Sequence, residues 1–259
     1  MKIISYSLYG NNFRYTEPLI LNAKNLSNFY PEWIIRVYHD DTVSNDVLLI
    51  LKKFNVQLID IKNVKTKYTQ LASKFWRFLP ILEANIDAII FRDADSIFTI
   101  REAKLVSDWL ESNHDYHIIR DHQLHISPIL AGMFGIKLGG FNLFRNQFFN
   151  YPKLTQTNTY NSDQIFLADH LYTQIIKSTL IHTSYFAFKG EKFERIEKCN
   201  TENGFIGAVL TDNDAGTGPV LINYDFIIGI PFCFAKLLRY RIRPVLYLSY
   251  FYNYLFNRK

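Results

Sequence analysis

Short apolar runs alternate with amphipathic segments along about the first hundred residues. Segments with helical spacing lie at residues 17–28, 47–54 and 69–84, and strand-like runs surround them at residues 2–8, 33–39, 56–61 and 87–91. Pro80 falls inside the third helical segment and should end or kink it, because proline lacks the backbone N–H that a helix uses. This alternation predicts a parallel sheet in an α/β fold, with helices on both faces.

The middle of the chain is less regular. Helices are expected at residues 101–111 and 161–174, and strand-like or apolar runs at 116–119, 128–137 and 179–181. Residues 191–199 are charged and are expected to be exposed, while residues 211–219 have the composition of a loop. We therefore expect one α/β domain over residues 1–210 and a separate helical, basic and aromatic segment over residues 220–259.

Composition supports an ordered domain. The chain has 259 residues, of which 48% are hydrophobic, 16% aromatic and only 20% charged. A chain of this kind can bury a full core. Its two cysteines, Cys199 and Cys233, suit neither a disulfide framework nor a zinc site. The first residues show no export signal, so a reducing cytoplasm is the expected location.

The net charge of +5 is concentrated at the end of the chain, where residues 221–259 hold six basic side chains and one acidic one. The neutral remainder disfavours a nucleic-acid partner. A basic and aromatic tail favours peripheral attachment to an anionic surface, here the inner face of the cytoplasmic membrane. Its apolar runs are shorter than the ~20 residues that span a bilayer. Packing of the tail on the core or on another subunit is the alternative.

Two carboxylates follow the buried run at 87–91, at Asp93 and Asp95. At the carboxyl end of a strand, both can reach one hard divalent cation, Mn²⁺ or Mg²⁺, which takes oxygen ligands. Such a cation bridges the diphosphate oxygens of a nucleotide sugar and neutralises the charge on the departing group. The alternative is an acidic turn that caps Arg92 or Arg101.

The surroundings of this pair resemble a known family, the glycosyltransferases of the GT-A fold. The likeness rests on Phe-Arg-Asp-Ala-Asp-Ser at 91–96, followed by Arg101, Glu102 and Trp109, and on the segments at 119–122, 125, 128–135 and 162–164. It is nearest to the subgroup of bacterial surface-polysaccharide loci and of large viruses that glycosylate. The likeness extends from about residue 1 to about residue 210 and does not include the tail.

The resemblance implies a GT-A-like fold, with a mixed, mostly parallel sheet and flanking helices. It also implies a function and a metal shell. The chain would move a sugar from a nucleoside-diphosphate sugar, most naturally a UDP-sugar, to a hydroxyl of a glycan or lipid-linked acceptor in surface polysaccharide synthesis. Asp93 and Asp95 would hold the metal with the nucleotide sugar, and His182 would complete the metal shell. A structural histidine is the alternative for His182.

Other positions are assigned to the donor. Asp40 or Asp41, after the second strand, would contact the base or ribose, or else form a turn. Lys74 and Arg77 lie three apart on one predicted helix face and can reach the diphosphate, unless they form a solvated face.

Tyr6 and Arg92 are assigned to the same nucleotide-sugar site. His122 and His125 would line the sugar or acceptor site, because zinc binding lacks further ligands there. Gly132 would let the backbone approach the donor sugar, or else serve a tight turn.

An inverting reaction needs a carboxylate that takes the proton of the attacking hydroxyl. Asp163, at the start of a predicted helix, is the first candidate, although helix capping explains it as well. Asp121 is the second candidate. Retention and inversion both remain open at this stage.

Three rival classes fit less well. A sugar nucleotidyltransferase shares the alternation and the metal, but residues 9–14 lack the glycine- and lysine-rich loop typical of that class. A two-metal hydrolase requires additional ligands. A catalytically degenerate transferase domain, acting as a membrane-docked assembly partner, would not need a metal site. The presence of both Asp93 and Asp95 therefore counts against it.

Overall fold

The computed structural model describes residues 1–64, 71–156, 161–185, 187–188, 190–199, 204–211 and 220–221. Its strands are β1 Lys2–Leu8, β2 Trp33–His39, β3 Gln57–Asp60, β4 Ala88–Phe91, β5 Tyr116–Arg120, β6 Phe134–Lys137, β7 Thr179–Thr183, β8 Glu194–Arg195, β9 Leu210–Thr211 and β10 Val220–Leu221. The α-helices are α1 Phe13–Phe29, α2 Asn45–Lys53, α3 Ile100–Glu111, α4 Phe141–Phe149, α5 Ser162–Phe166 and α6 Tyr172–Ile175. Tighter 3-10 turns occur at η1 Ile61–Asn63, η2 Ser73–Leu82, η3 Leu138–Gly140 and η5 Ile176–Ser178, and a π-helical stretch at η4 Leu167–Leu171.

In the described part of the chain, eight strands form the central sheet, in the order β3-β2-β1-β4-β6-β5-β7-β8. All neighbouring pairs are parallel except the two that involve β6, which runs antiparallel to β4 and to β5. Strands β9 and β10 make a separate antiparallel pair. The expected mixed, mostly parallel sheet with flanking helices is therefore confirmed.

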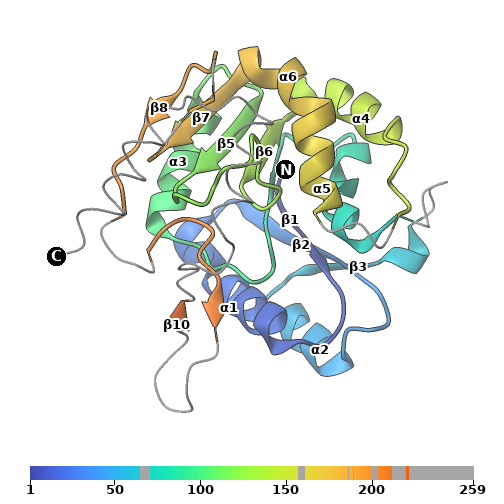
Figure 1. The fold of residues 1–259 in the computed structure, drawn as a ribbon. Helices are drawn as coiled ribbons and strands as arrows, with labels where there is room; N and C mark the ends of the chain where they lie inside the picture. Colours follow the sequence, from blue (N-terminus) through green and yellow to red (C-terminus); the bar gives the residue numbers. More distant parts are fainter. Residues whose placement is uncertain are drawn as a thin grey trace.

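Alternation along the strands divides the core into two layers. Ile3 and Phe91 face the layer built by η2, α4 and α5, whereas Ile4 and Ile90 face the layer built by α1, α2 and α3. Figure 1 shows α4 and α5 together on one side of the sheet and α1 with α2 on the other. Successive strand residues point to opposite faces, so each apolar run of the sequence supplies both layers.

The segment before β4 differs from the expected α-helix. Residues 73–82 form the 3-10 helix η2, with Pro80 inside it. Ser5 Oγ donates to the carbonyl oxygen of Arg77 at 2.7 Å, and the backbone N–H of Arg77 donates to Ser7 Oγ at 2.9 Å. These two bonds fasten η2 to β1. The hydroxyls therefore set where the Arg77 side chain emerges.

Two further segments differ from expectation. The helix expected at 161–174 is divided into α5, the π-helical η4 and α6. The stretch at 191–199 is not wholly exposed: Glu191 is buried against Arg120, and β8 extends the sheet. A charged residue that is buried in an ion pair is not marked by the hydrophobic periodicity of the sequence. The burial of Glu191 could therefore not be predicted from this charged stretch.

The expected C-terminal segment lies almost entirely outside the described residues, which include only Val220 and Leu221 of it. The membrane-binding tail therefore stays a prediction. None of the helices in the described part of the chain is long and apolar enough to cross a membrane.

Candidate active site

The aspartate pair leaves the carboxyl end of β4, a strand whose four residues are all buried. The Asp93 side chain is 48% exposed, while that of Asp95 is 13% exposed. Ser96 closes the turn that carries both aspartates, because its backbone N–H and its hydroxyl both donate to the carbonyl oxygen of Asp93. Both carboxylates are thus held at the carboxyl ends of the parallel strands β1, β2 and β4.

Arg77 joins this pair to a third carboxylate. Its Nη1 lies 2.5 Å from Asp93 Oδ1, and its Nη2 lies 3.5 Å from Asp163 Oδ2. Nη1 also donates to the carbonyl oxygen of Arg92 at 3.2 Å. Burial acts to lower the pKa of Arg77, but the carboxylates of Asp93 and Asp163 together raise it above its ordinary value. Residues from η2, from the turn after β4 and from α5 therefore form one charged cluster.

Lys74 belongs to the same region. A 3-10 helix has about three residues per turn, so side chains at i and i+3 lie one above the other. Lys74 is half-buried one such turn before Arg77, and its charge is among those that lower the pKa of Asp163. The spacing that suggested a shared helix face thus holds in the tighter helix.

Asp163 occupies the first turn of α5, after Asn161, whose φ of 55° places it in the left-handed region. The Asp163 side chain is only 7% exposed, and its Oδ1 accepts the backbone N–H of Gln164 at 2.9 Å. Burial raises the pKa of Asp163, Arg77 opposes that effect, and Asp93 adds to it. A carboxylate with a raised pKa is a stronger proton acceptor than an ordinary one.

Arg14 is a site residue that sequence reasoning missed. Its Nη2 lies 3.2 Å from Asp95 Oδ2. Burial raises the pKa of Asp95 to about 6, the nearby charge of Asp93 adds to this, and Arg14 opposes it. The missed signal was Asn12, whose side chain accepts the backbone N–H of Arg14 and starts α1 four residues before the expected helix.

Gly132 lies directly against Asp93. A Cβ at this position would be 2.0 Å from Asp93 Oδ2 and 2.5 Å from its Cγ. No side chain fits there, so the glycine leaves space for the Asp93 carboxylate. Gly132 was assigned to the donor sugar, and the structure places it beside the aspartate pair.

His182 is not brought to the aspartate pair. Strands β6 and β5 separate β7 from β4 in the sheet, and the His182 side chain is 1% exposed. Its Nδ1 lies 2.8 Å from Nε2 of His117, and its Nε2 lies 3.2 Å from Oε2 of Glu194. Both ring nitrogens are therefore occupied, and the alternative reading of His182 as a structural histidine is the one that the geometry favours.

Asp121 is an anchor between segments. Arg101 donates to it twice, each bond at 2.9 Å, and Ser184 Oγ and the backbone N–H of Ile206 donate to it as well. Its side chain has no exposed surface. Since both oxygens are already hydrogen-bonded, the geometry favours Asp163 as the proton acceptor.

The two histidines after Asp121 are neighbours, with ring centroids 5.6 Å apart, but they differ in burial. His125 Nδ1 accepts the backbone N–H groups of Asp121 and His122, at 3.0 and 3.1 Å. Burial, with smaller contributions from His122 and Arg120, holds the pKa of His125 well below its usual value. His125 thus closes a turn. His122 is half-buried and stacks on Phe205 with ring centroids 4.3 Å apart.

Asp40 and Asp41 both have local partners. Asp40 Oδ1 accepts the backbone N–H and the hydroxyl of Thr42, at 3.1 and 2.5 Å, and so closes a turn after β2. Asp41 pairs with Lys62 at 2.5 Å, and its side chain is 71% exposed. The turn that was the alternative reading of these aspartates is therefore present.

Tyr6 and Arg92 are both buried in the core. Tyr6 has no exposed surface, and its hydroxyl accepts Asn22 Nδ2 at 3.2 Å. Arg92 is 3% exposed and pairs with buried Glu102. The assignment of both to the nucleotide sugar is corrected here: on β1 and after β4, their side chains point toward the α1 and α3 layer.

The donor set fits a hard divalent cation that also binds a substrate. Within the described residues, no group of three or more His, Cys, Asp or Glu side chains is placed to hold a metal ion. Mg²⁺ and similar ions commonly bind through one or two carboxylates, with water and substrate phosphates completing the shell. Asp93 and Asp95 supply two such carboxylates, and Gly132 leaves space beside the first.

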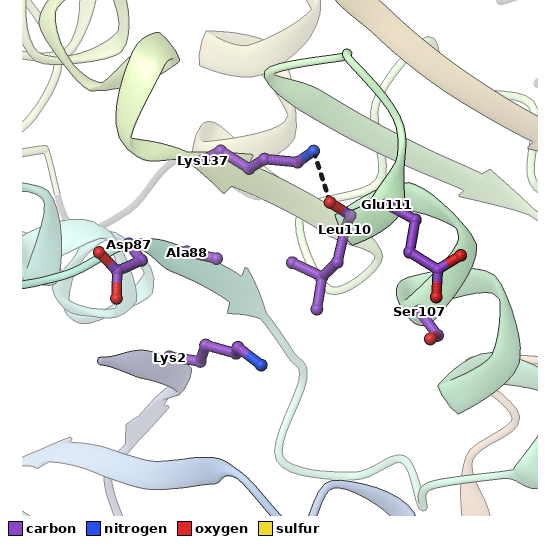
Figure 2. A pocket seen from close by; sticks show the side chains of 7 residues that line it. All are labelled: Lys2, Asp87, Ala88, Ser107, Leu110, Glu111 and Lys137. Carbon is purple, nitrogen blue, oxygen red and sulfur yellow. Dashed lines mark hydrogen bonds between the residues drawn. The ribbon is translucent and has the colours of Figure 1, made fainter.

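A separate hollow of about 440 Å³ lies at the other end of the strands, where β1 and β4 begin (Figure 2). Lys2 and Ala88 begin β1 and β4 there, whereas Asp93 follows the other end of β4. Lys137 is, with Lys2, one of two lysines that line the hollow. Its Nζ donates to the carbonyl oxygens of Leu110 and Ser112, at 3.1 and 2.7 Å, so it caps the end of α3. This hollow is therefore distinct from the aspartate site.

Comparisons with known proteins give a likeness in backbone only. No family model and no curated protein matches the chain. Among solved structures, it is similar to a glycosyltransferase involved in the glycosylation of the major capsid of PBCV-1, at 13% identity over 71% of this chain and 82% of that one, with a TM-score of 0.45. It is also similar to residues 1–349 of S. aureus TarS, at 16% identity over 66% and 55% of the two chains, with a TM-score of 0.46. A third is the galactosyltransferase LgtC, in complex with donor and acceptor sugar analogs, at 13% identity over 73% and 75%, with a TM-score of 0.44. Likeness of this degree assigns no role to any residue.

Proposed function

We propose that this chain is a metal-dependent glycosyltransferase that moves a sugar from a nucleoside-diphosphate sugar, with a UDP-sugar favoured, to a hydroxyl group. The observation that carries the proposal is the cluster in which Arg77 links Asp93, at the end of β4, to Asp163, in the first turn of α5. It combines a pair of carboxylates for a hard cation, basic groups for a diphosphate and a buried carboxylate for a proton.

The proposed roles follow from the position of each side chain. Asp93 and Asp95 would hold Mn²⁺ or Mg²⁺, which when bound neutralises charge on a departing diphosphate. Arg77 presents a planar guanidinium, suited to bidentate contact with phosphate oxygens. Lys74, one turn earlier on η2, adds a second positive charge. Anchoring of η2 to β1 orients the Arg77 guanidinium before any ligand arrives.

Asp163 would accept the proton of the attacking hydroxyl. Asp163→Asn keeps the shape and the bond from Gln164 but removes the proton acceptor, so turnover should fall about 10²- to 10⁴-fold. Donor affinity should change much less. Steady-state kinetics with a fixed acceptor measures both quantities. Asp169→Asn, at an exposed position of η4, is the matched control. Wild-type turnover of Asp163→Asn would remove Asp163 from this role.

Gly132→Ala should weaken binding of a nucleoside diphosphate with Mn²⁺ by about ten- to a hundredfold, the loss typical when the surroundings of a metal ligand are disturbed. The reason is the 2.0 Å approach of the added Cβ to Asp93 Oδ2. Gly139→Ala is a matched control, because its Cβ would approach Asp115 Oδ1 to 2.3 Å, away from the site. Isothermal titration calorimetry compares the two. Equal losses in both variants would indicate a general effect on the fold.

The acceptor is proposed to be a glycan or a lipid-linked glycan in surface polysaccharide synthesis, at the inner face of the cytoplasmic membrane. Support comes from the six basic residues and the aromatic side chains of the segment 221–259. Cosedimentation of the full chain with vesicles of anionic lipid tests the attachment. A protein that stays in the supernatant at low salt would contradict it.

The experiment that tests the proposed function is thermal unfolding with a panel of nucleoside diphosphates and their sugars, with and without Mn²⁺. A ligand that binds only the folded chain raises its stability. We expect a Mn²⁺-dependent rise in Tm for one nucleoside family, with uridine favoured. An unchanged Tm across the whole panel would count against the function and for a degenerate, non-catalytic domain.

A further inference from the structure

Each carboxylate of the aspartate pair is matched by an arginine. Arg77 lies on Asp93 at 2.5 Å, and Arg14 lies on Asp95 at 3.2 Å. With Asp163 and Lys74 added, three carboxylates face three basic side chains. The cluster is therefore formally neutral without any ligand.

The two arginines differ in how firmly they are held. The Arg77 side chain is 9% exposed, its guanidinium contacts two carboxylates, and its backbone is bonded to two serines of β1. The Arg14 side chain is 32% exposed and comes from the first turn of α1. Of the two, Arg14 is the more exposed and lies farther from its carboxylate, so it can move away from it with less loss of burial.

We propose that Arg14 occupies the cation's place on Asp95 while the site is empty, and turns to the diphosphate of the donor when the cation binds. This inference rests on the proposed function, because it assumes that Asp95 is a metal ligand. It assigns a ligand-binding role to a residue outside the aspartate pair and outside η2.

The charge balance supports the exchange. A divalent cation alone would add two positive charges to a neutral cluster and would be repelled by Arg14 on the same carboxylate. A diphosphate that arrives with the cation restores the balance and gives the displaced guanidinium an anion with the geometry it prefers. The structure therefore favours joint binding of cation and diphosphate over binding of the cation alone.

The test uses the full chain with Mn²⁺ alone and with inorganic pyrophosphate as probes, both followed by isothermal titration calorimetry. Arg14→Gln should bind Mn²⁺ alone roughly two- to fivefold more tightly than the wild type, the range that a partly exposed ion pair supports. The same variant should bind pyrophosphate in the presence of Mn²⁺ about tenfold more weakly, through loss of a charge-assisted contact. A residue with only a structural role would not shift the two affinities in opposite directions.

Two further variants complete the test. Arg14→Lys keeps the charge and loses the planar fork, so it should bind Mn²⁺ alone as the wild type does and pyrophosphate with intermediate affinity. Lys104→Gln removes a positive charge from an exposed position of α3 and should leave both affinities unchanged.

The possible results distinguish a failure of the Arg14 inference from a failure of the proposed function. If the wild type binds pyrophosphate with Mn²⁺ but Arg14→Gln shifts neither affinity, or shifts both in the same direction, the inference is overturned and the function stands. If the wild type binds neither probe, the metal site is overturned and the inference with it. Unchanged thermal unfolding of Arg14→Gln without ligand excludes loss of the fold as the cause.

Discussion

Asp93→Asn should lower the rate of sugar transfer by roughly a thousandfold or more while leaving the protein folded. A bound cation contributes several kcal/mol of charge stabilisation, and each 1.4 kcal/mol is about a factor of ten in rate. The amide preserves the shape of a side chain that is 48% exposed, and Arg77 keeps its second carboxylate, Asp163. Release of nucleoside diphosphate from sugar nucleotides measures the rate, and thermal unfolding measures the fold.

The matched control is Asp46→Asn, an exposed aspartate in the first turn of α2. It should retain the full rate. A rate for Asp93→Asn within a few-fold of wild type, insensitive to removal of metal by a chelator, would contradict the assignment of Asp93 as a metal ligand. A large drop in Tm for Asp93→Asn but not for Asp46→Asn would mean that the main role of the Asp93–Arg77 ion pair is to stabilise the fold.

Glu102→Ala should destabilise the folded state by about 3–5 kcal/mol, because it breaks a buried ion pair. Glu102 and Arg92 are paired with side chains only 2% and 4% exposed, directly beneath the aspartate turn. Removal of the carboxylate leaves a buried guanidinium without its counter-charge. Urea unfolding gives the difference in the free energy of unfolding.

Glu111→Ala, at the exposed end of the same helix, provides the comparison and should stay within about 0.5 kcal/mol of wild type. If both variants unfold at the same urea concentration as the wild type, the buried pair does not stabilise the base of the site. Partial loss of Mn²⁺-dependent binding in Glu102→Ala is also expected, because Arg92 directly precedes Asp93 in the chain.

Much of the sheet could be predicted from the sequence, because its strands are buried on both faces and stand out as apolar runs between amphipathic helices. The direction of β6 could not, since an antiparallel strand inside a largely parallel sheet has the same apolar composition as its neighbours. The tight helix at 73–82 was expected as an ordinary α-helix. Its anchors, Ser5 and Ser7, lie about seventy residues away on β1, beyond the reach of any local pattern.

The site residues could be predicted where a charged side chain follows a predicted buried strand or lies at a recognisable position of a predicted helix. Asp93 and Asp95 follow a buried strand, and Asp163 and Arg77 lie on the segments that meet it. Arg14 was missed because the start of α1 was placed too late, at residue 17.

For His182 and Tyr6, the direction of the side chain could not be predicted. His182 and Tyr6 both lie on strands, and the sequence does not show which face of the sheet each one meets. The structure turns both into the core. Asp121 was chosen for its chemistry, and its four hydrogen bonds come from three separate parts of the chain, so only the folded structure brings these donors together.

The most direct test of the central claim is the release of nucleoside diphosphate by the wild-type chain from a panel of sugar nucleotides, with Mn²⁺ and after chelation. Water can replace the acceptor hydroxyl, so slow release is measurable before the acceptor is known. The account predicts release from one nucleoside family, with UDP-sugars favoured, that depends on Mn²⁺ and is lost in Asp93→Asn. Release that persists after chelation and in Asp93→Asn, or no release from any donor, would contradict it.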